Sequence, residues 1–148
     1  MREISKSVSN LKANSEIISW CSNWLKEHNV PSEIKMFGKR PILLWGSTIN
    51  NAEILFNTHI DVVPAGKDQF KPIQKKDKVF GRGADDAKSS TAIFLNLSKK
   101  MFKIVKKKNI LFSITTDEET GGNTTRLFIS TLPKLKFAIF GEPTNLKI

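Results

Sequence analysis

Three apolar, strand-like segments alternate with two helical ones in the second half of the chain. The expected strands cover residues 53–57, 109–115 and 137–140, and the expected helices cover residues 86–102 and 124–132. Strands that alternate with helices in this way form layered α/β folds in which the strands are parallel neighbours. The segment 109–115 is almost continuously apolar, which is typical of a strand buried on both faces. We therefore expect a three-layer α/β fold with a mostly parallel central sheet flanked by helices.

The first half of the chain is expected to extend this sheet. A helix should begin with Asn14 or Ser15 as its N-cap, followed by strands at residues 32–37, at the outer edge, and 41–45. The apolar face of this helix recurs every three or four positions: Ile17, Cys21, Trp24, Leu25 and His28. His28 ends the helix and is expected to be structural, and residues 62–79 are expected to form a long loop.

The two helices of the second half have their own signals. The helix over 86–102 shows one apolar face at helical spacing, made of Ile93, Leu97, Met101 and Ile104. Thr124 can cap the short helix that follows, and Pro133 lies just beyond its end. The strand at 137–140 is expected to be buried.

The composition indicates a soluble domain. A chain of 148 residues with 39% hydrophobic and 26% charged residues can form one domain with a real core. No run approaches the ~18 apolar residues of a membrane span, and residues 1–14 contain no signal-peptide core, so we expect a cytoplasmic protein. The single cysteine, Cys21, excludes an internal disulfide and a cysteine-based zinc site.

The net charge of +10 comes mostly from lysine. Specific nucleic-acid surfaces favour arginine interleaved with aromatic residues, and the chain has four arginines. The densest lysine cluster, residues 99–108, falls at the end of an expected helix, where positive charge suits the helix dipole. The sequence therefore disfavours a nucleic-acid partner, and weak, salt-sensitive binding to polyanions stays as a rival hypothesis.

Acidic and imidazole side chains follow the expected strands of the second half. His59 follows the first strand, Glu118 and Glu119 follow the second, and Glu142 follows the third. Asp86 stands at the start of the first connecting helix, behind the glycine turn of residues 81–83. Because functional groups of parallel sheets gather beyond the carboxyl ends of the strands, all of these side chains should lie at one edge.

One imidazole and several carboxylates without cysteine suit Zn²⁺, Co²⁺ or Mn²⁺. Two such ions bridged by one carboxylate can activate water and polarise a carbonyl group. Asp61 lies two positions after His59, so both side chains point the same way and Asp61 can hold the second imidazole nitrogen. Glu118 and Glu119 are adjacent and point to different sides, so one can bind metal while the other acts as a general base.

Four segments together resemble the signature blocks of one zinc-dependent hydrolase family. They are THIDVVP at residues 58–64, GRGADDAK at 81–88, TDEETGG at 116–122 and GEPT at 141–144. The family includes acetylornithine deacetylase, succinyl-diaminopimelate desuccinylase, aminoacylase and glutamate carboxypeptidase. The blocks occur in the family's order, and the resemblance spans most of the chain.

The resemblance implies the ligands of two metal ions. His59 and Glu142 match ligands of the first ion, Glu119 matches a ligand of the second, and Asp86 matches the carboxylate that bridges both. The peptide bond between Asp86 and Ala87 is implied to be cis.

The resemblance also implies a reaction. Glu118 matches the general base that deprotonates a metal-activated water for attack on an amide carbonyl, and Asp61 matches the carboxylate behind His59. The implied substrates are N-acyl amino acids or short peptides. One departure from the family pattern is the pair Ser89 and Ser90, where glycines are common.

A second departure concerns length. Family members are more than twice as long, and their later part supplies a further histidine for the second metal. The other histidine here, His28, precedes the site. We therefore expect residues 1–148 to be the N-terminal portion of a metallohydrolase catalytic domain, without the lid or dimerisation domain and weakly active or inactive alone. Candidate partners are a missing C-terminal half or a second copy of the chain. The rival hypothesis is a non-catalytic metal-binding or interaction fragment.

Overall fold

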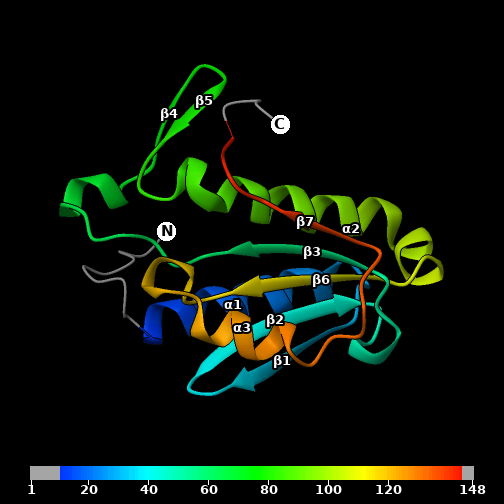
Figure 1. Ribbon diagram of the computed structural model, residues 1–148. Coiled ribbons are helices and arrows are strands. Elements are labelled where there is room, and N and C mark those ends of the chain that lie inside the picture. Colours follow the sequence, from blue (N-terminus) through cyan, green and yellow to red (C-terminus); the bar gives the residue numbers. More distant parts are fainter. Residues whose placement is uncertain (1–10, 145–148) are drawn as a thin grey trace.

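A five-stranded mixed sheet forms the centre of the molecule (Figure 1). The computed structural model describes residues 11–144. The strands are ordered β1-β2-β6-β3-β7. Their bounds are β1 Ser32–Phe37, β2 Arg40–Gly46, β3 Ile54–His59, β6 Ile110–Thr115 and β7 Phe137–Phe140. β3 is parallel to β6 and β7, whereas β2 is antiparallel to β1 and β6, so the three strands predicted to be parallel neighbours are confirmed as such.

Helices cover both faces of the sheet, which confirms the predicted three-layer α/β fold. Helices α1 (Leu11–Glu27) and α2 (Ser89–Lys107) share one face, and α3 (Asn123–Ile129) covers the other. The core between α1, α2 and the sheet includes Ile18, Leu25, Phe94, Leu95, Trp45 and Phe112. The core beneath α3 includes Phe128, Ile42, Leu44, Leu55 and Leu111. In residues 11–144, no helix has the length and apolar character needed to cross a membrane.

The central strand β6 explains why residues 109–115 are almost continuously apolar. β6 pairs with β2 on one side and β3 on the other, and most of its residues are buried. The ring of Phe112 stacks on Trp45 and Phe56, with centroids 5.1 Å and 4.9 Å apart, and meets Phe94 of α2 edge-on. The predicted burial of this strand on both faces is confirmed.

The predicted apolar face of α2 is only partly the face that packs on the sheet. Leu97 is partly buried and packs against the core, whereas Ile93, Met101 and Ile104 are exposed. The buried apolar side chains of the helix are Phe94, Leu95 and Val105. Apolar residues occur on more than one face of this helix, so periodicity alone could not identify the buried one. Aromatic contact with the sheet selects the face that carries Phe94.

The strand β7 is exposed, although its apolar sequence predicted burial. All four of its residues are exposed, and within the described part of the chain β7 pairs only with β3 and lies at the edge of the sheet. The apolar pattern correctly predicted a strand here but not its position in the sheet.

The predicted caps of two helices are wrong. Helix α1 already includes Leu11, and Asn14 is buried within it, where its side chain donates a hydrogen bond to the carbonyl oxygen of Thr116 (3.2 Å). Helix α3 begins at Asn123, and the Asp117 carboxylate accepts the backbone N–H of Thr124 (2.7 Å). Asn14 therefore lies inside α1, and for α3 a carboxylate seven residues before Thr124 accepts an N–H of the first turn.

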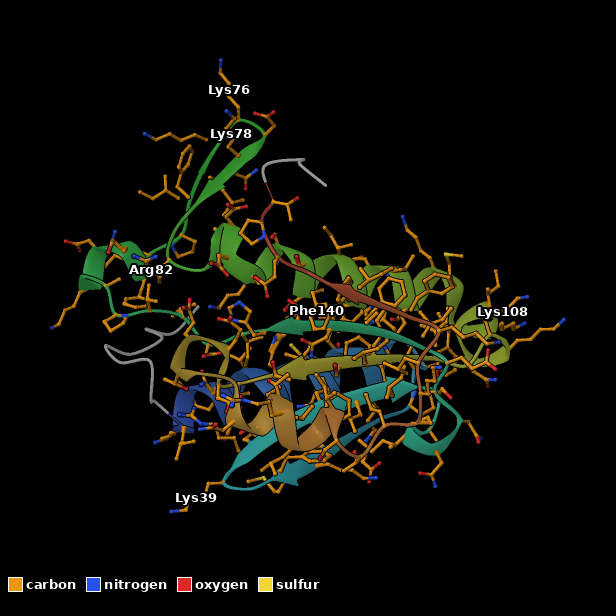
Figure 2. All side chains as sticks on the ribbon, in the orientation of Figure 1. Lys39, Lys76, Lys78, Arg82, Lys108 and Phe140 are labelled. Carbon is orange, nitrogen blue, oxygen red and sulfur yellow. The ribbon has the colours of Figure 1, made fainter. Side chains whose placement is uncertain are left out.

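The segment 62–79 contains more structure than the predicted loop. A 3-10 turn (Lys67–Phe70) precedes a hairpin of β4 (Ile73–Lys75) and β5 (Lys78–Phe80), which projects from the body of the molecule (Figure 1). Lys76 and Lys78 lie near its tip (Figure 2). Lys76 adopts a positive φ of 53° in the two-residue turn, a position where Asn or Gly is the usual sequence signal.

Candidate metal centre

The parallel strands bring the predicted site residues to one edge of the sheet. β3 ends at His59, which is in register with Thr115 at the end of β6, and the arrowheads of both strands point to the same end (Figure 1). Glu118 follows β6 and Glu142 follows β7. Asp86 lies in the turn Ala84–Lys88 that leads into α2.

Three of these side chains converge on one point. The Nε2 atom of His59 lies 3.0 Å from Asp86 Oδ1 and 3.6 Å from Glu142 Oε2. One ligand atom from each residue lies within 4.8 Å of the others. Ligand atoms around a tetrahedral zinc ion are about 3.3 Å apart, so this donor set fits a divalent metal ion.

The candidate centre is open on one side. The His59 side chain is 1% exposed, whereas the side chains of Asp86 and Glu142 are 53% and 38% exposed. The imidazole is therefore fixed by the core and the carboxylates face solvent, which leaves room for water or a substrate beside a bound ion.

Asp61 connects two strand ends. Its buried carboxylate accepts the backbone N–H groups of Glu118 (3.2 Å) and Glu119 (3.0 Å). His59 Nδ1 lies 3.1 Å from the Asp61 carbonyl oxygen and 3.4 Å from Oδ1. The sequence predicted the contact with His59, but it missed the two backbone hydrogen bonds because no local pattern signals a contact over 57 residues.

The adjacent glutamates have different surroundings. Glu118 Oε2 lies 3.9 Å from His59 Nε2. Glu119 is outside the convergent group of three, and burial together with the negative charge of Asp86 raises the pKa of its carboxyl group. Glu119 therefore lies within the electrostatic reach of Asp86, the residue that the resemblance assigns as the bridge.

The acidic surroundings act strongly on His59. Burial by itself lowers the pKa of the imidazole, but the hydrogen bond and charge of Asp61, with the charges of Glu142 and Glu118, outweigh burial and raise the pKa to about 9. Burial and the charges of Asp86 and Glu118 raise the pKa of Glu142, against the lowering influence of His59. A metal ion that binds here must displace the proton on His59.

The turn that carries Asp86 has the backbone that the resemblance implies. The Asp86–Ala87 peptide bond is cis, which confirms that expectation. Gly83 has a φ of 77°, a conformation that glycine adopts readily, and its carbonyl oxygen accepts the N–H of Lys88 (3.0 Å). The Thr58 hydroxyl donates to the carbonyl oxygen of Ala87 (3.4 Å), which ties the turn to β3.

Two basic residues of the same segment have buried side-chain nitrogen atoms. The Arg82 Nε and Lys88 Nζ atoms are buried and have no hydrogen-bond partner among the described residues. The sequence interpretation gave neither residue a role. The available signal was their position, since they flank the two aspartates of one motif.

Residues 55–148 match the model of peptidase family M20/M25/M40. The chain belongs to this family. The M20 family is metal-dependent, which agrees with the convergent histidine and carboxylates, and the resemblance predicted from the four sequence blocks is confirmed.

The curated relatives include desuccinylases. A succinyl-diaminopimelate desuccinylase of Rickettsia typhi is 36% identical over 146 residues, which cover 86% of this chain and 38% of the relative. A desuccinylase of the same name from Rickettsia felis is 34% identical over 148 residues, again 86% of this chain and 38% of the relative. The chain thus spans 38% of the length of these relatives.

Solved structures show the same fold. Human carnosine dipeptidase 1 matches with a TM-score of 0.69 at 17% identity, over 95% of this chain and 35% of that structure. An M20 family metallo-carboxypeptidase from Sulfolobus solfataricus matches with a TM-score of 0.64 at 16% identity, over 94% of this chain and 35% of that structure. At these identities the likeness concerns the fold, and it agrees with the predicted α/β class.

Proposed function

We propose that residues 1–148 form the N-terminal portion of the catalytic domain of a metal-dependent amide hydrolase. The observation that carries this proposal is the convergence of His59, Asp86 and Glu142 in a chain of the M20 family. Zn²⁺, Co²⁺ and Mn²⁺ all suit these donors. The names of the desuccinylase relatives make an N-succinyl amino acid the first substrate to test, with other N-acyl amino acids and short peptides as alternatives.

We propose a separate role in hydrolysis for each residue around the centre. When bound, the metal would polarise the amide carbonyl and lower the pKa of a water molecule. We assign to Glu118 the uptake of the proton of the attacking water and its return to the leaving amine, a role supported by its half-exposed side chain near His59 Nε2. Asp61 holds the backbone of Glu118 and the ring of His59, which fixes the position of the proposed base relative to the proposed metal ligand.

The two proposed metal positions have different numbers of proposed ligands in this chain. His59, Asp86 and Glu142 serve the first position, whereas Asp86 and Glu119 are the proposed ligands of the second. His28, the other histidine of the chain, stacks on Trp24 with ring centroids 3.9 Å apart. We expect a Zn²⁺ titration by calorimetry to show one tight site and a weaker one. Two equally tight sites would contradict this assignment.

Replacement of the general base tests the function. In a full-length protein that contains this segment, Glu118→Gln keeps the shape of the side chain but removes its basicity, so hydrolysis of an N-succinyl amino acid should fall by about 10²- to 10⁴-fold while bound metal is retained. Glu16→Gln, at an exposed position of α1, is the matched control and should change neither. Loss of metal in Glu118→Gln would make Glu118 a ligand instead of a base, and a wild-type chain that binds no metal would refute the proposal.

One observation favours a second candidate, a non-catalytic interaction fragment. The edge strand β7 exposes Phe137, Ile139 and Phe140, and edge strands with apolar residues pair readily with other chains. Size-exclusion chromatography with light scattering distinguishes the two. Metal binding and self-association without hydrolysis, even after the C-terminal half of a relative is added, favour the interaction fragment. Hydrolysis by the metal-loaded chain, alone or mixed with that half, favours the enzyme.

A further inference from the structure

The ammonium group of Lys88 is buried, and the residue belongs to the turn Ala84–Lys88 that carries Asp86. Its Nζ atom has no hydrogen-bond partner in residues 11–144. It packs directly against Gly83, because a Cβ at that position would lie 2.5 Å from Nζ and 2.6 Å from Val62 Cγ1. The glycine turn therefore leaves the space that the lysine amine fills.

The charge of Lys88 faces the acidic side of the site. The amine lies beside the turn that carries Asp86, since the Cβ position on Gly83 that meets Lys88 Nζ is also 3.5 Å from the Asp86 carbonyl oxygen. Burial lowers the pKa of the Lys88 ammonium to about 8, while the negative charges of Asp61, Glu119 and Asp86 act to raise it and the charge of Arg82 lowers it. None of the ion pairs of 4 Å or less found between described residues includes Lys88, so its charge acts on the carboxylates as a group and not through one salt bridge.

On its other side, Lys88 faces mostly apolar surroundings, which do not favour a charged side chain. There it lines a cavity of about 190 Å³ between α1 and α2, and most of the remaining wall is apolar. Apolar wall residues include Ile17, Trp20, Trp24, Ile60 and Leu95. A buried cation without a partner is unfavourable, and an apolar side chain of similar size is often at least as stable in such a position. The acidic cluster is the feature that accounts for a lysine here.

We propose that Lys88 is a positioning residue whose positive charge holds the carboxylates of the metal centre together and competes with a bound metal ion for them. Without metal, the ammonium offsets the mutual repulsion of Asp61, Glu119 and Asp86. With metal, the same charge opposes the ion and weakens its binding. Lys88 thus sets how tightly the site holds its metal. This inference rests on the proposed metal site.

Replacement of Lys88 with methionine separates charge from packing. Lys88→Met keeps a long unbranched side chain and removes the charge. We expect the melting temperature of the metal-free chain to fall by at least about 3 °C. We expect Zn²⁺ affinity, measured by competition with a chromophoric chelator, to rise by at least about tenfold, since a unit charge acts strongly on a nearby divalent ion. Lys100→Met removes the same charge from an exposed position of α2 and should leave both quantities unchanged.

The two readouts must move in opposite directions. A purely structural role of Lys88 would lower stability and metal affinity together, and that result overturns the inference. Unchanged affinity, or an unchanged or raised melting temperature, also overturns it. A variant that is unfolded without metal but folds on addition of Zn²⁺ supports it, whereas one that stays unfolded with Zn²⁺ refutes it. A wild-type chain that binds no Zn²⁺ would instead refute the proposed function.

Discussion

Substitution of Asp61 with asparagine should destabilise the chain and weaken the metal centre together. The Asp61 carboxylate accepts two backbone N–H groups, from Glu118 at 3.2 Å and from Glu119 at 3.0 Å. Asparagine has the same shape but offers one oxygen and one NH₂ group. Whichever way the amide is turned, one backbone N–H then faces a second donor instead of an acceptor.

The expected cost follows from these two hydrogen bonds. A buried N–H left without an acceptor costs about 2 kcal/mol, and the change of the other acceptor from ionised to neutral costs about 1 kcal/mol. The sum is about 3 kcal/mol, which for a chain of this size corresponds to a fall of roughly 10 °C in melting temperature. Zn²⁺ affinity should fall by about 10- to 100-fold, because the carboxylate that contacts His59 Nδ1 is gone.

Thermal unfolding of the metal-free chain and NMR titration of His59 measure the two effects. The charge of Asp61 is one cause of the raised pKa of His59, so that pKa should move down from about 9 in Asp61→Asn. Asp68→Asn is the matched control, since among residues 11–144 its side chain pairs with the exposed Lys71 alone and is 95% exposed. A melting temperature within 2 °C of wild type, on the scale of about 3 °C for each kcal/mol, would refute the role given to the two backbone hydrogen bonds.

Four further outcomes are expected. Because metal binding displaces a proton from His59, Zn²⁺ affinity should rise about tenfold per pH unit between pH 7 and 9, measured by competition titration. Protonation of His59 stabilises the metal-free fold fully below its ordinary pKa of 6.5, so the melting temperature should fall as pH rises through about 9. Gly83→Ala should cost about 2 kcal/mol in urea unfolding, because its φ is 77° and its Cβ would meet Lys88 and Val62, whereas Gly66→Ala, with open space around it, should be neutral. Phe112→Ala should cost about 4 kcal/mol in the same assay, since the ring is fully buried against three aromatic rings.

The sequence was most informative where chemistry and secondary structure coincide. His59 and Glu142 directly follow apolar strands, and the parallel pairing of those strands places both side chains at one edge. The pattern of apolar residues was enough to predict β3, β6 and β7. The ends of these strands then indicated where the group of His59, Asp86 and Glu142 would converge. The metal-binding roles of Glu119 and the catalytic role of Glu118 stay predictions that the proposed experiments test.

The sequence was least informative where a residue depends on a distant partner. The buried position of Asn14 reflects its hydrogen bond to Thr116, and nothing near residue 14 indicates it. The buried face of α2 depends on which rings the sheet offers to Phe94. Lys88 shows the same limit, because a lysine in a charged motif suggests a solvated side chain until the packing of Gly83 is known.

The edge position of β7 has a mechanical consequence for the metal centre. In the described part of the chain, hydrogen bonds to β3 alone connect this strand to the sheet, and Glu142 lies two residues beyond its end. An ion bound by both His59 and Glu142 would link the end of β3 to the segment after β7 and so stabilise the edge strand. Hydrogen exchange of the β7 amides should therefore slow when the metal is added. Exchange within β6, which already pairs with β2 and β3, should change little.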